Sequence, residues 1–129
     1  MGATILMADD NPRLRALIRR ILEREPDLQL VGEARDGAEA VHLSHEQRPD
    51  VVLLDLVMPQ VNGLEATQQI KAERSETKVI IMTVHTEDAY RQAAQASGAD
   101  AFLLKKTLMT ALLPTIRCLC SGMSLPNSP

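Results

Sequence analysis

Three carboxylates and one ammonium group stand at the ends of short apolar runs in this chain of 129 residues. The four residues are Asp9, Asp10, Asp55 and Lys105. The apolar runs before them are Ala3–Ala8, Val51–Leu54 and Ala101–Leu104. Short apolar runs that alternate with helical patterns predict parallel strands, and ligands of an open parallel sheet bind just beyond the carboxyl ends of its strands. We therefore expect all four groups to meet at one edge of a sheet.

Carboxylates that crowd one edge repel one another, and this repulsion favours a bound cation. Hard oxygen ligands with positions left for water suit Mg²⁺. We expect Asp10 and Asp55 to supply two ligands, with Asp9 in support and with main-chain oxygen and water completing the shell. For Asp9 and Asp10 an alternative stays open, because one of them could instead help Asn11 to cap the helix that begins at Pro12.

Asp55 is the strongest candidate for a reacting group. A carboxylate at the end of an otherwise apolar strand costs free energy unless it is paired or coordinated. Pro59 separates it from the next predicted helix, so it is a poor helix cap. Its chemistry would be attack on phosphorus to give an aspartyl phosphate. Lys105 and Thr83 could contact the phosphoryl oxygens. Taken alone, Lys105 could instead be an ordinary surface lysine and Thr83 an ordinary strand residue.

The elements that must position these groups are strands and helices in strict alternation. The predicted strands are Ala3–Ala8, Leu28–Ala34, Val51–Asp55, Val79–Thr83 and Ala101–Leu104. The first four helices are expected to follow the capping residues Asn11, Asp36, Asn62 and Thr86. The fifth is expected from Thr107 to about Leu119. This order predicts a doubly wound α/β domain with helices on both faces of a parallel sheet.

The bulk properties of the chain narrow the class of protein. Its length suits one domain, and a net charge of −3 argues against a nucleic-acid-binding surface on this segment. Cys118 and Cys120 lie two apart on a predicted helix, where side chains do not face each other, so reduced thiols are expected. With no signal peptide and no apolar run of membrane length, a cytoplasmic protein without membrane contact is expected. Residues 121–129 predict the start of a linker after a domain at 1–120.

The chain resembles the receiver domain of bacterial two-component response regulators over nearly its whole length. The motifs that carry the likeness are Asp9–Pro12, Asp55–Pro59, Asn62–Glu65, Thr83 and Gly98–Lys105. The local sequences Val31–Ala34 and Leu103–Lys105 are similar to those of the NarL/FixJ (LuxR-type) subfamily. The resemblance implies a CheY-like, flavodoxin-like (βα)5 fold with its five parallel strands in the order 2-1-3-4-5.

The same resemblance implies a role for each site residue. Asp55 would be the phosphoacceptor, with Lys105 and Thr83 contacting the phosphoryl group. The Mg²⁺ ligands would be Asp10, Asp55 and the backbone carbonyl of Val57, supported by Asp9. Phe102 would be an aromatic switch residue that turns inward as Thr83 moves and so changes the surface formed by the fourth helix, fifth strand and fifth helix.

The resemblance also implies partners. These are a sensor histidine kinase as phosphodonor, a second copy of the chain after phosphorylation, and DNA only through a C-terminal helix-turn-helix domain beyond the linker. The chain would be a signalling switch and not an enzyme, with self-phosphorylation and self-dephosphorylation at Asp55 only. A basic face of the first helix, including Arg15 and Arg19, is expected to help dock the kinase, unless it is simply a solvated face.

The same residues argue against three other functions. A phosphohydrolase with an aspartyl nucleophile would place a carboxylate two residues after Asp55, where Val57 stands. A flavin carrier would need a phosphate-binding loop after the first strand, where Asp9 and Asp10 would repel phosphate. An unphosphorylated pseudo-receiver that only dimerises would not need the intact acidic set.

Two residues depart from the family pattern. Val57 replaces a frequent Asn of the family, and the bulk of Val84 is expected to crowd the phosphoryl site.

Overall fold

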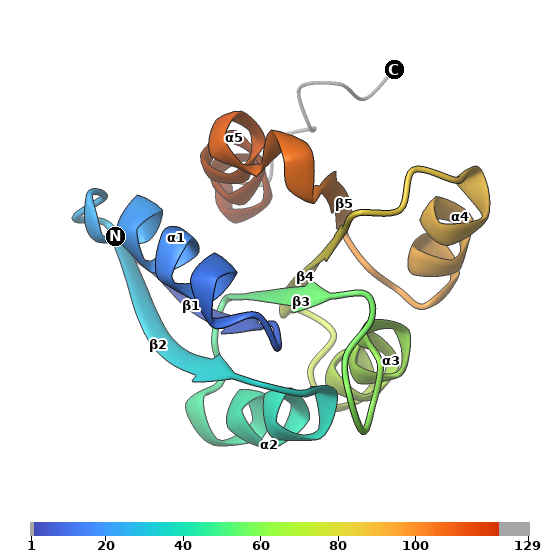
Figure 1. The fold of residues 1–129 in the computed structure, drawn as a ribbon. Helices are drawn as coiled ribbons and strands as arrows, with labels where there is room; N and C mark the ends of the chain where they lie inside the picture. Colours follow the sequence, from blue (N-terminus) through green and yellow to red (C-terminus); the bar gives the residue numbers. More distant parts are fainter. Residues whose placement is uncertain (1, 122–129) are drawn as a thin grey trace.

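In the computed structural model, which describes residues 2–121, five parallel strands form one sheet with helices on both of its faces (Figure 1). The strands are β1 Ala3–Ala8, β2 Leu28–Ala34, β3 Val51–Asp55, β4 Lys78–Thr83 and β5 Ala101–Leu104. The helices are α1 Pro12–Glu23, α2 Gly37–Gln47, α3 Gly63–Glu73, α4 Asp88–Ala96 and α5 Leu108–Ser121, with a short 3-10 helix, η1 Lys105–Thr107, before α5. The strand order β2-β1-β3-β4-β5 confirms the predicted doubly wound, CheY-like fold.

Three of the predicted helix caps are confirmed. The side chain of Asn11 accepts hydrogen bonds at the start of α1. Asp36 accepts a hydrogen bond from the amide of Glu39 in α2, and Asn62 accepts one from the amide of Glu65 in α3. Each bond satisfies an amide that has no partner inside the first helical turn, which explains why these helices begin where they do.

The start of α4 differs from the sequence prediction. The expected cap was Thr86, but the helix begins at Asp88, and the residue in the capping position is Glu87, which makes no side-chain cap hydrogen bond. Thr86 stands one residue too early to serve as the cap of this helix. The end of α4 agrees with the prediction, because Gly98 has a φ of 101°, a conformation that glycine adopts without a steric penalty.

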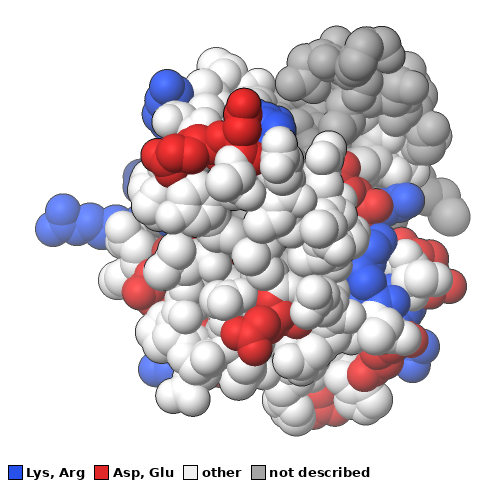
Figure 2. Space-filling view, turned by 90° about the vertical axis from the view of Figure 1, so that its right-hand side faces the viewer, with Lys and Arg blue, Asp and Glu red and all other residues white. Residues whose placement is uncertain are grey.

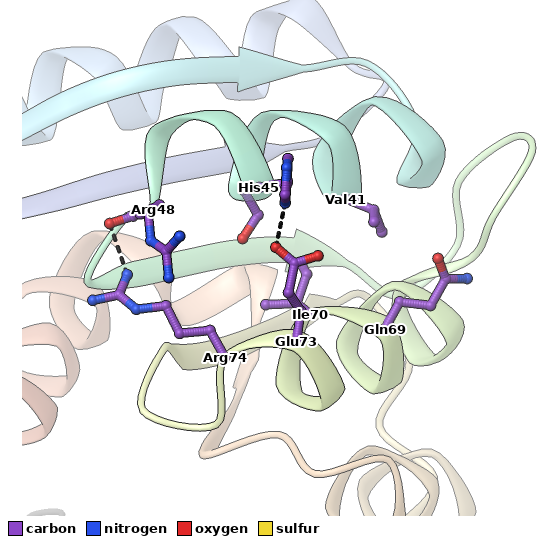
Figure 3. A pocket seen from close by; sticks show the side chains of 8 residues that line it. Val41, His45, Arg48, Gln69, Ile70, Glu73 and Arg74 are labelled. Atoms are coloured by element: carbon purple, nitrogen blue, oxygen red, sulfur yellow. Dashed lines mark hydrogen bonds and ion pairs between the residues drawn. The ribbon is translucent and has the colours of Figure 1, made fainter.

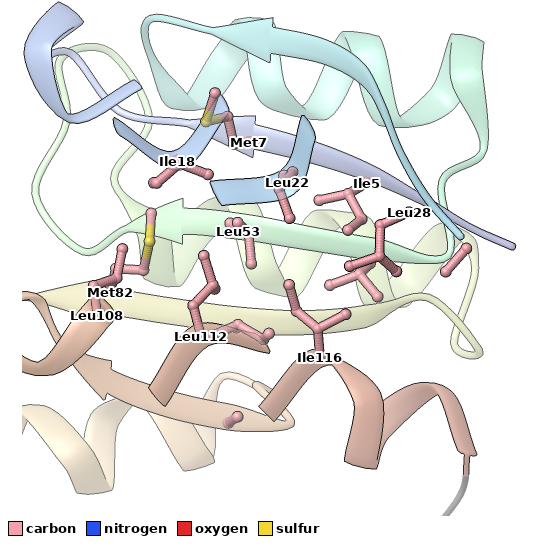
Figure 4. Close-up of a cluster of buried hydrophobic side chains, with 14 residues drawn as sticks. Ile5, Met7, Ile18, Leu22, Leu28, Leu53, Met82, Leu108, Leu112 and Ile116 are labelled. Atoms are coloured by element: carbon pink, nitrogen blue, oxygen red, sulfur yellow. The ribbon is translucent and has the colours of Figure 1, made fainter. Parts of the chain in front are cut away.

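The sheet divides the hydrophobic core into two clusters. α1 and α5 cover one face, where Ile18, Leu112 and Ile116 pack against side chains of the strands (Figure 4). α2, α3 and α4 cover the other face (Figure 1), and Ala40, Ile70 and Ala94 of these helices are buried in its cluster. All residues of β3 are buried, as expected for a central strand of a parallel sheet that is covered on both sides.

The parallel register places the ends of four strands side by side. The register pairs there are Ala8 with Leu54, Asp55 with Met82 and Thr83 with Leu104. The residues that end β3 and β4, and those that follow β1 and β5, therefore share one edge of the sheet. The predicted metal-binding and phosphoryl-contacting residues lie at this carboxyl edge or in the segments that leave it, whereas the predicted switch residue Phe102 lies inside β5, opposite Ile81.

A small pocket between α2 and α3 shares no residue with the predicted site (Figure 3). The imidazole ring of His45 forms a hydrogen bond with the carboxylate of Glu73 beside it, and Arg74 donates a hydrogen bond to the carbonyl of Arg48. Its volume of about 10 Å³ has room for at most about one water molecule. This pocket is therefore a seam between two packed helices and offers no space for a ligand.

Two sequence expectations concern the ends and environment of the chain. Apart from Ser121, which closes α5, the predicted linker lies outside the described residues. Among residues 2–121, no helix has both the length and the apolar character needed to cross a membrane.

Candidate functional site

Asp9, Asp10 and Asp55 lie together at the carboxyl edge of the sheet and form what we call the acidic cluster. Each offers a carboxylate oxygen, and these three oxygens lie within 4.8 Å of one another. Asp9 follows β1 and is fully buried, Asp55 ends β3 and is 7% exposed, and Asp10 lies at the surface. The structure therefore brings together the three carboxylates that the sequence predicts, in a site that solvent reaches at Asp10.

Lys105 enters the acidic cluster from the end of β5. Its Nζ lies 2.8 Å from Oδ2 of Asp9 and 3.1 Å from Oδ1 of Asp55. From the sequence we expect Lys105 to contact a phosphoryl group on Asp55, and in the structure it contacts the Asp55 carboxylate itself, with Asp9 as a second and nearer partner. One ammonium group thus bridges two carboxylates that would otherwise repel each other at close range.

Burial and charge shift the protonation of these groups. Burial raises the pKa of Asp55 above its ordinary value and the negative charge of Asp9 raises it further, although Lys105 acts in the opposite direction. Burial by itself would lower the pKa of Lys105, but its hydrogen bonds to Asp9 and Asp55 and their charges outweigh burial and raise it. Lys105 therefore stays cationic at neutral pH and remains available to balance negative charge at Asp55.

Thr83 ends β4 at the same edge and is almost fully buried. Its hydroxyl oxygen accepts a hydrogen bond of 3.0 Å from the amide of His85. A threonine hydroxyl can accept and donate at the same time, so its proton is still available to another acceptor. The loop after β4 therefore fixes the position of the hydroxyl without using its donor capacity.

The two valines that depart from the family pattern both face solvent. Val57 is 59% exposed and Val84 is 71% exposed. Val84 therefore presents most of its surface to solvent, and the expected crowding of the phosphoryl site stays a prediction. Neither valine provides a carboxylate or another polar side chain at the rim of the acidic cluster.

Gly63 shapes the site in a way that the sequence analysis missed. A Cβ atom at this position would lie 2.3 Å from the carbonyl oxygen of Asp55. The amide of Gly63 also donates a hydrogen bond of 2.9 Å to the carbonyl of Leu56. Glycine is therefore required where α3 begins against the end of β3. The available signal was its place directly after the capping residue Asn62.

The predicted switch residue, Phe102, lies beside α4. Its ring is partly buried against the cluster on that face of the sheet. The guanidinium of Arg91 lies over the ring, 4.9 Å from its centroid. Nearby along the chain, the rings of His85 and Tyr90 stack with centroids 4.4 Å apart. Aromatic and cationic contacts thus connect α4 to β5 and to the loop after β4.

The basic face of α1 is not uniformly solvated, which corrects the simplest expectation for it. The side chain of Arg15 is only 15% exposed, and its Nη1 donates a hydrogen bond of 2.6 Å to the backbone carbonyl of Asp9. Arg19 forms two hydrogen bonds of 2.7 Å with Glu33 on β2. Of the two arginines expected to dock a kinase, Arg15 is therefore committed to contacts inside the domain. Helical spacing alone gave no signal for this.

Comparison with known proteins identifies the family to which this fold belongs. Residues 5–117 match the family described as response regulator receiver domain. The transcriptional regulatory protein LiaR of Bacillus subtilis (strain 168) is 38% identical over 118 residues, which are 92% of this chain and 56% of that protein. The transcriptional regulatory protein DegU of Brevibacillus brevis is 34% identical over 118 residues, which are 92% of this chain and 50% of that protein. The chain thus spans about half the length of these relatives.

Solved structures give the same result. A LuxR-family two-component response regulator from Aurantimonas sp. SI85-9A1 superposes with a TM-score of 0.90 at 32% identity, covering 98% of this chain and 92% of that one. The signal receiver domain of the response regulator NarL from Mycobacterium tuberculosis superposes with a TM-score of 0.89 at 31% identity, covering 94% of this chain and 98% of that one. The chain therefore belongs to the response regulator receiver domain family and, within it, to the NarL/FixJ (LuxR-type) subfamily.

Proposed function

We propose that Asp55 accepts a phosphoryl group from a sensor histidine kinase and that the aspartyl phosphate changes the surface formed by α4, β5 and α5. The observation that carries this proposal is the arrangement around Asp55. An ammonium group, Lys105, lies 3.1 Å from its carboxylate, and two further carboxylates lie close enough to share a cation with it. Such a site is prepared for a reaction that brings more negative charge to Asp55.

The acidic cluster fits a divalent cation. Three carboxylate oxygens within 4.8 Å of one another suit a shared hard ion, and the exposure of Asp10 leaves room for the water ligands that Mg²⁺ retains. We propose Asp10, Asp55 and the backbone carbonyl of Val57 as ligands, with Asp9 in support. When bound, Mg²⁺ would offset charge on the oxygens of the transferring phosphoryl group.

The groups of the chain itself account for the transfer. An oxygen of Asp55 attacks phosphorus in line with the bond to the imidazole nitrogen of the donor. The new P–O bond forms as the P–N bond breaks, and the electron pair leaves with the imidazole. Lys105 is placed to pair with one phosphoryl oxygen, and the hydroxyl proton of Thr83 can be donated to another.

The proposed output is a shift between two conformations. A hydrogen bond from Thr83 to the phosphoryl group would draw the end of β4 inward, and the ring of Phe102 would fill the vacated space. The ring is only partly buried, so part of its surface remains to be covered. Phosphorylation would then favour the inward state. A second copy of the chain would be one partner for the altered surface.

DNA contact is proposed only through a further domain beyond this chain. The net charge is −3, and the side of the molecule where α3 and α4 lie shows scattered acidic and basic groups and no broad basic patch (Figure 2). The transcriptional regulators that the chain resembles are about twice its length, which supports this arrangement. The cytoplasmic location expected from the sequence stays a prediction.

The proposed role is a switch and not a turnover enzyme. Two residues after Asp55, where a phosphohydrolase would carry a second carboxylate, Val57 presents an exposed apolar side chain. A pseudo-receiver that only dimerises would have no use for the complete acidic cluster and its bridging lysine.

Acetyl phosphate and intact-mass spectrometry test the proposal. With Mg²⁺ present, the chain should gain one phosphoryl group, and omission of Mg²⁺ should abolish the gain. Asp55→Asn should not be labelled under the same conditions. Equal labelling of the Asn variant would show that the acceptor lies elsewhere.

A further inference from the structure

We propose that Arg15 is a positioning residue that fixes the peptide between Asp9 and Asp10 and thereby holds Asp10 ready for the cation. This inference rests on the Mg²⁺-dependent function proposed above. Arg15 lies near the start of α1, and its Nη1 donates a hydrogen bond of 2.6 Å to the carbonyl oxygen of Asp9. A hydrogen bond from a charged donor is stronger than one between neutral groups, so this contact can hold a backbone carbonyl firmly.

Arg15 is itself held in place from β2. Its Nε lies 3.5 Å from an oxygen of Glu33, and the same carboxylate accepts two hydrogen bonds from Arg19. These hydrogen bonds lower the pKa of Glu33 against the opposing effect of burial, so Glu33 is charged at neutral pH. Arginine is seldom so little exposed unless it is paired. The guanidinium of Arg15 therefore has a fixed position between β2 and the acidic cluster.

The placement of Asp10 depends on its backbone. Within residues 2–121, the carboxylate of Asp10 makes no hydrogen bond or ion pair, so no side-chain contact there sets its direction before a cation binds. The preceding residue, Asp9, makes three other contacts. Its N–H donates a hydrogen bond of 3.1 Å to the carbonyl of Ala34, its Oδ1 accepts one of 2.8 Å from the amide of Asn11, and its Oδ2 lies 2.8 Å from Nζ of Lys105. The contact from Arg15 holds the carbonyl of the peptide that leads directly into Asp10.

The competing explanation is that Arg15 only braces α1 against β2. Arg19 already provides such a brace through its two hydrogen bonds to Glu33, and within the described chain it makes no contact with Asp9. The two explanations differ in what they predict. Loss of a brace lowers the stability of the fold, whereas loss of a positioning contact also weakens cation binding at an otherwise folded site.

The experiment compares three variants of the full 129-residue chain. Arg15→Ala removes the contact with Asp9, Arg19→Ala removes the main brace to Glu33, and Arg13→Ala removes one exposed positive charge from the same helix. Mg²⁺ is titrated while the backbone amide signals of the acidic cluster are followed by NMR. Urea denaturation without Mg²⁺ gives the stability of each variant separately.

The expected result is selective. Arg15→Ala should weaken Mg²⁺ binding about tenfold, as loss of groups that orient metal ligands does in other proteins. Arg19→Ala should lower stability but change Mg²⁺ affinity by less than about twofold, and Arg13→Ala should also stay within about twofold. Equal Mg²⁺ affinities for the Arg15 and Arg19 variants would overturn the positioning role.

A conservative variant keeps the proposal testable if Arg15→Ala does not fold. Arg15→Lys retains the charge, but an ammonium lacks the planar fork that serves Asp9 and Glu33 together, so about threefold weaker Mg²⁺ binding is expected. Unchanged affinity in Arg15→Lys would overturn the inference. Absence of Mg²⁺ binding by the unmodified chain would instead overturn the proposed function, so the two failures are distinguishable.

Discussion

Lys105 Nζ lies closer to a buried oxygen of Asp9, at 2.8 Å, than to the carboxylate of Asp55, at 3.1 Å. The ammonium group is therefore held by one carboxylate while it faces the other. Because Asp9 holds it independently, Lys105 should stay in the pocket when the charge at Asp55 changes. This relationship gives Asp9 a role besides support of a metal ion.

Lys105→Ala should destabilise the domain, because Asp9 is fully buried and would lose its cationic partner. Removing one partner of a buried pair costs about 3–5 kcal/mol, and the partial exposure of Lys105 points to the lower end, about 3 kcal/mol. Urea denaturation at neutral pH measures this loss. Lys106→Ala is the matched control, since its side chain is exposed and its effect should stay within about 0.5 kcal/mol. Similar stabilities for the two variants would contradict the account of Asp9.

Asp55→Asn should stabilise the metal-free domain at neutral pH, by up to about 1 kcal/mol. Burial, and then the charge of Asp9, raise the pKa of Asp55 in the folded state. The folded state thus binds this proton more tightly than the unfolded chain, and stability of the unmodified domain falls as pH rises through the interval between the ordinary and the raised pKa.

The advantage of the Asn variant should therefore be complete above that pH interval and disappear below it. Thermal melts of both proteins in metal-free buffer across acidic and neutral pH measure the difference. Added Mg²⁺ should stabilise the unmodified domain and leave the Asn variant nearly unchanged. If the extra stability of Asp55→Asn over the unmodified domain instead grew as the pH falls, the folded state would not be raising the pKa of Asp55.

Gly63→Ala should disturb Asp55 directly, because the added Cβ would lie 2.3 Å from its carbonyl oxygen. Overpacking of this kind costs about 1–3 kcal/mol, and the NMR amide signals at the end of β3 should shift. Gly98→Ala serves as a contrast, because its cost of about 1–2 kcal/mol would come from a left-handed backbone. A Cβ at Gly98 would lie no closer than 3.6 Å to the flexible side chain of Lys71. Matching shifts near Asp55 in both variants would contradict the proposed contact.

Arg91→Ala should free the ring of Phe102, because the guanidinium lies 4.9 Å from the ring centroid. Such a contact at an exposed site is worth about 0.5–1 kcal/mol, enough to shift a two-state equilibrium several-fold. NMR with beryllofluoride, a phosphoryl mimic, should then show a more populated inward state than in the unmodified chain. Gln92→Ala, an exposed change on the same helix, should behave like the unmodified chain. Signal changes confined to the Asp55 pocket would reject the switch.

Much of the fold could be predicted because it depends on local patterns. The apolar runs define the strands, and the side chains of Asn11, Asp36 and Asn62 cap helices in the structure as their positions indicate. The meeting of Asp9 and Asp55 follows from the strand ends alone, since parallel strands present these ends to one edge.

The remaining features depend on which side chains meet across distant segments. Nothing in helical spacing separates the exposed Arg13 from Arg15, whose side chain is partly buried because Glu33 and the carbonyl of Asp9 lie opposite it. The choice of Asp9 as the nearer partner of Lys105 likewise depends on how the ends of β1 and β5 approach each other across the sheet.

The central claim is that Asp55 carries the phosphoryl group, and locating the modified residue tests it most directly. The chain is labelled with acetyl phosphate and Mg²⁺, reduced with borohydride, which converts an aspartyl phosphate to homoserine, and mapped by peptide mass spectrometry. The account predicts homoserine at position 55 and none at Asp9 or Asp10. Homoserine at either of those positions, with Asp55 unmodified, would contradict it.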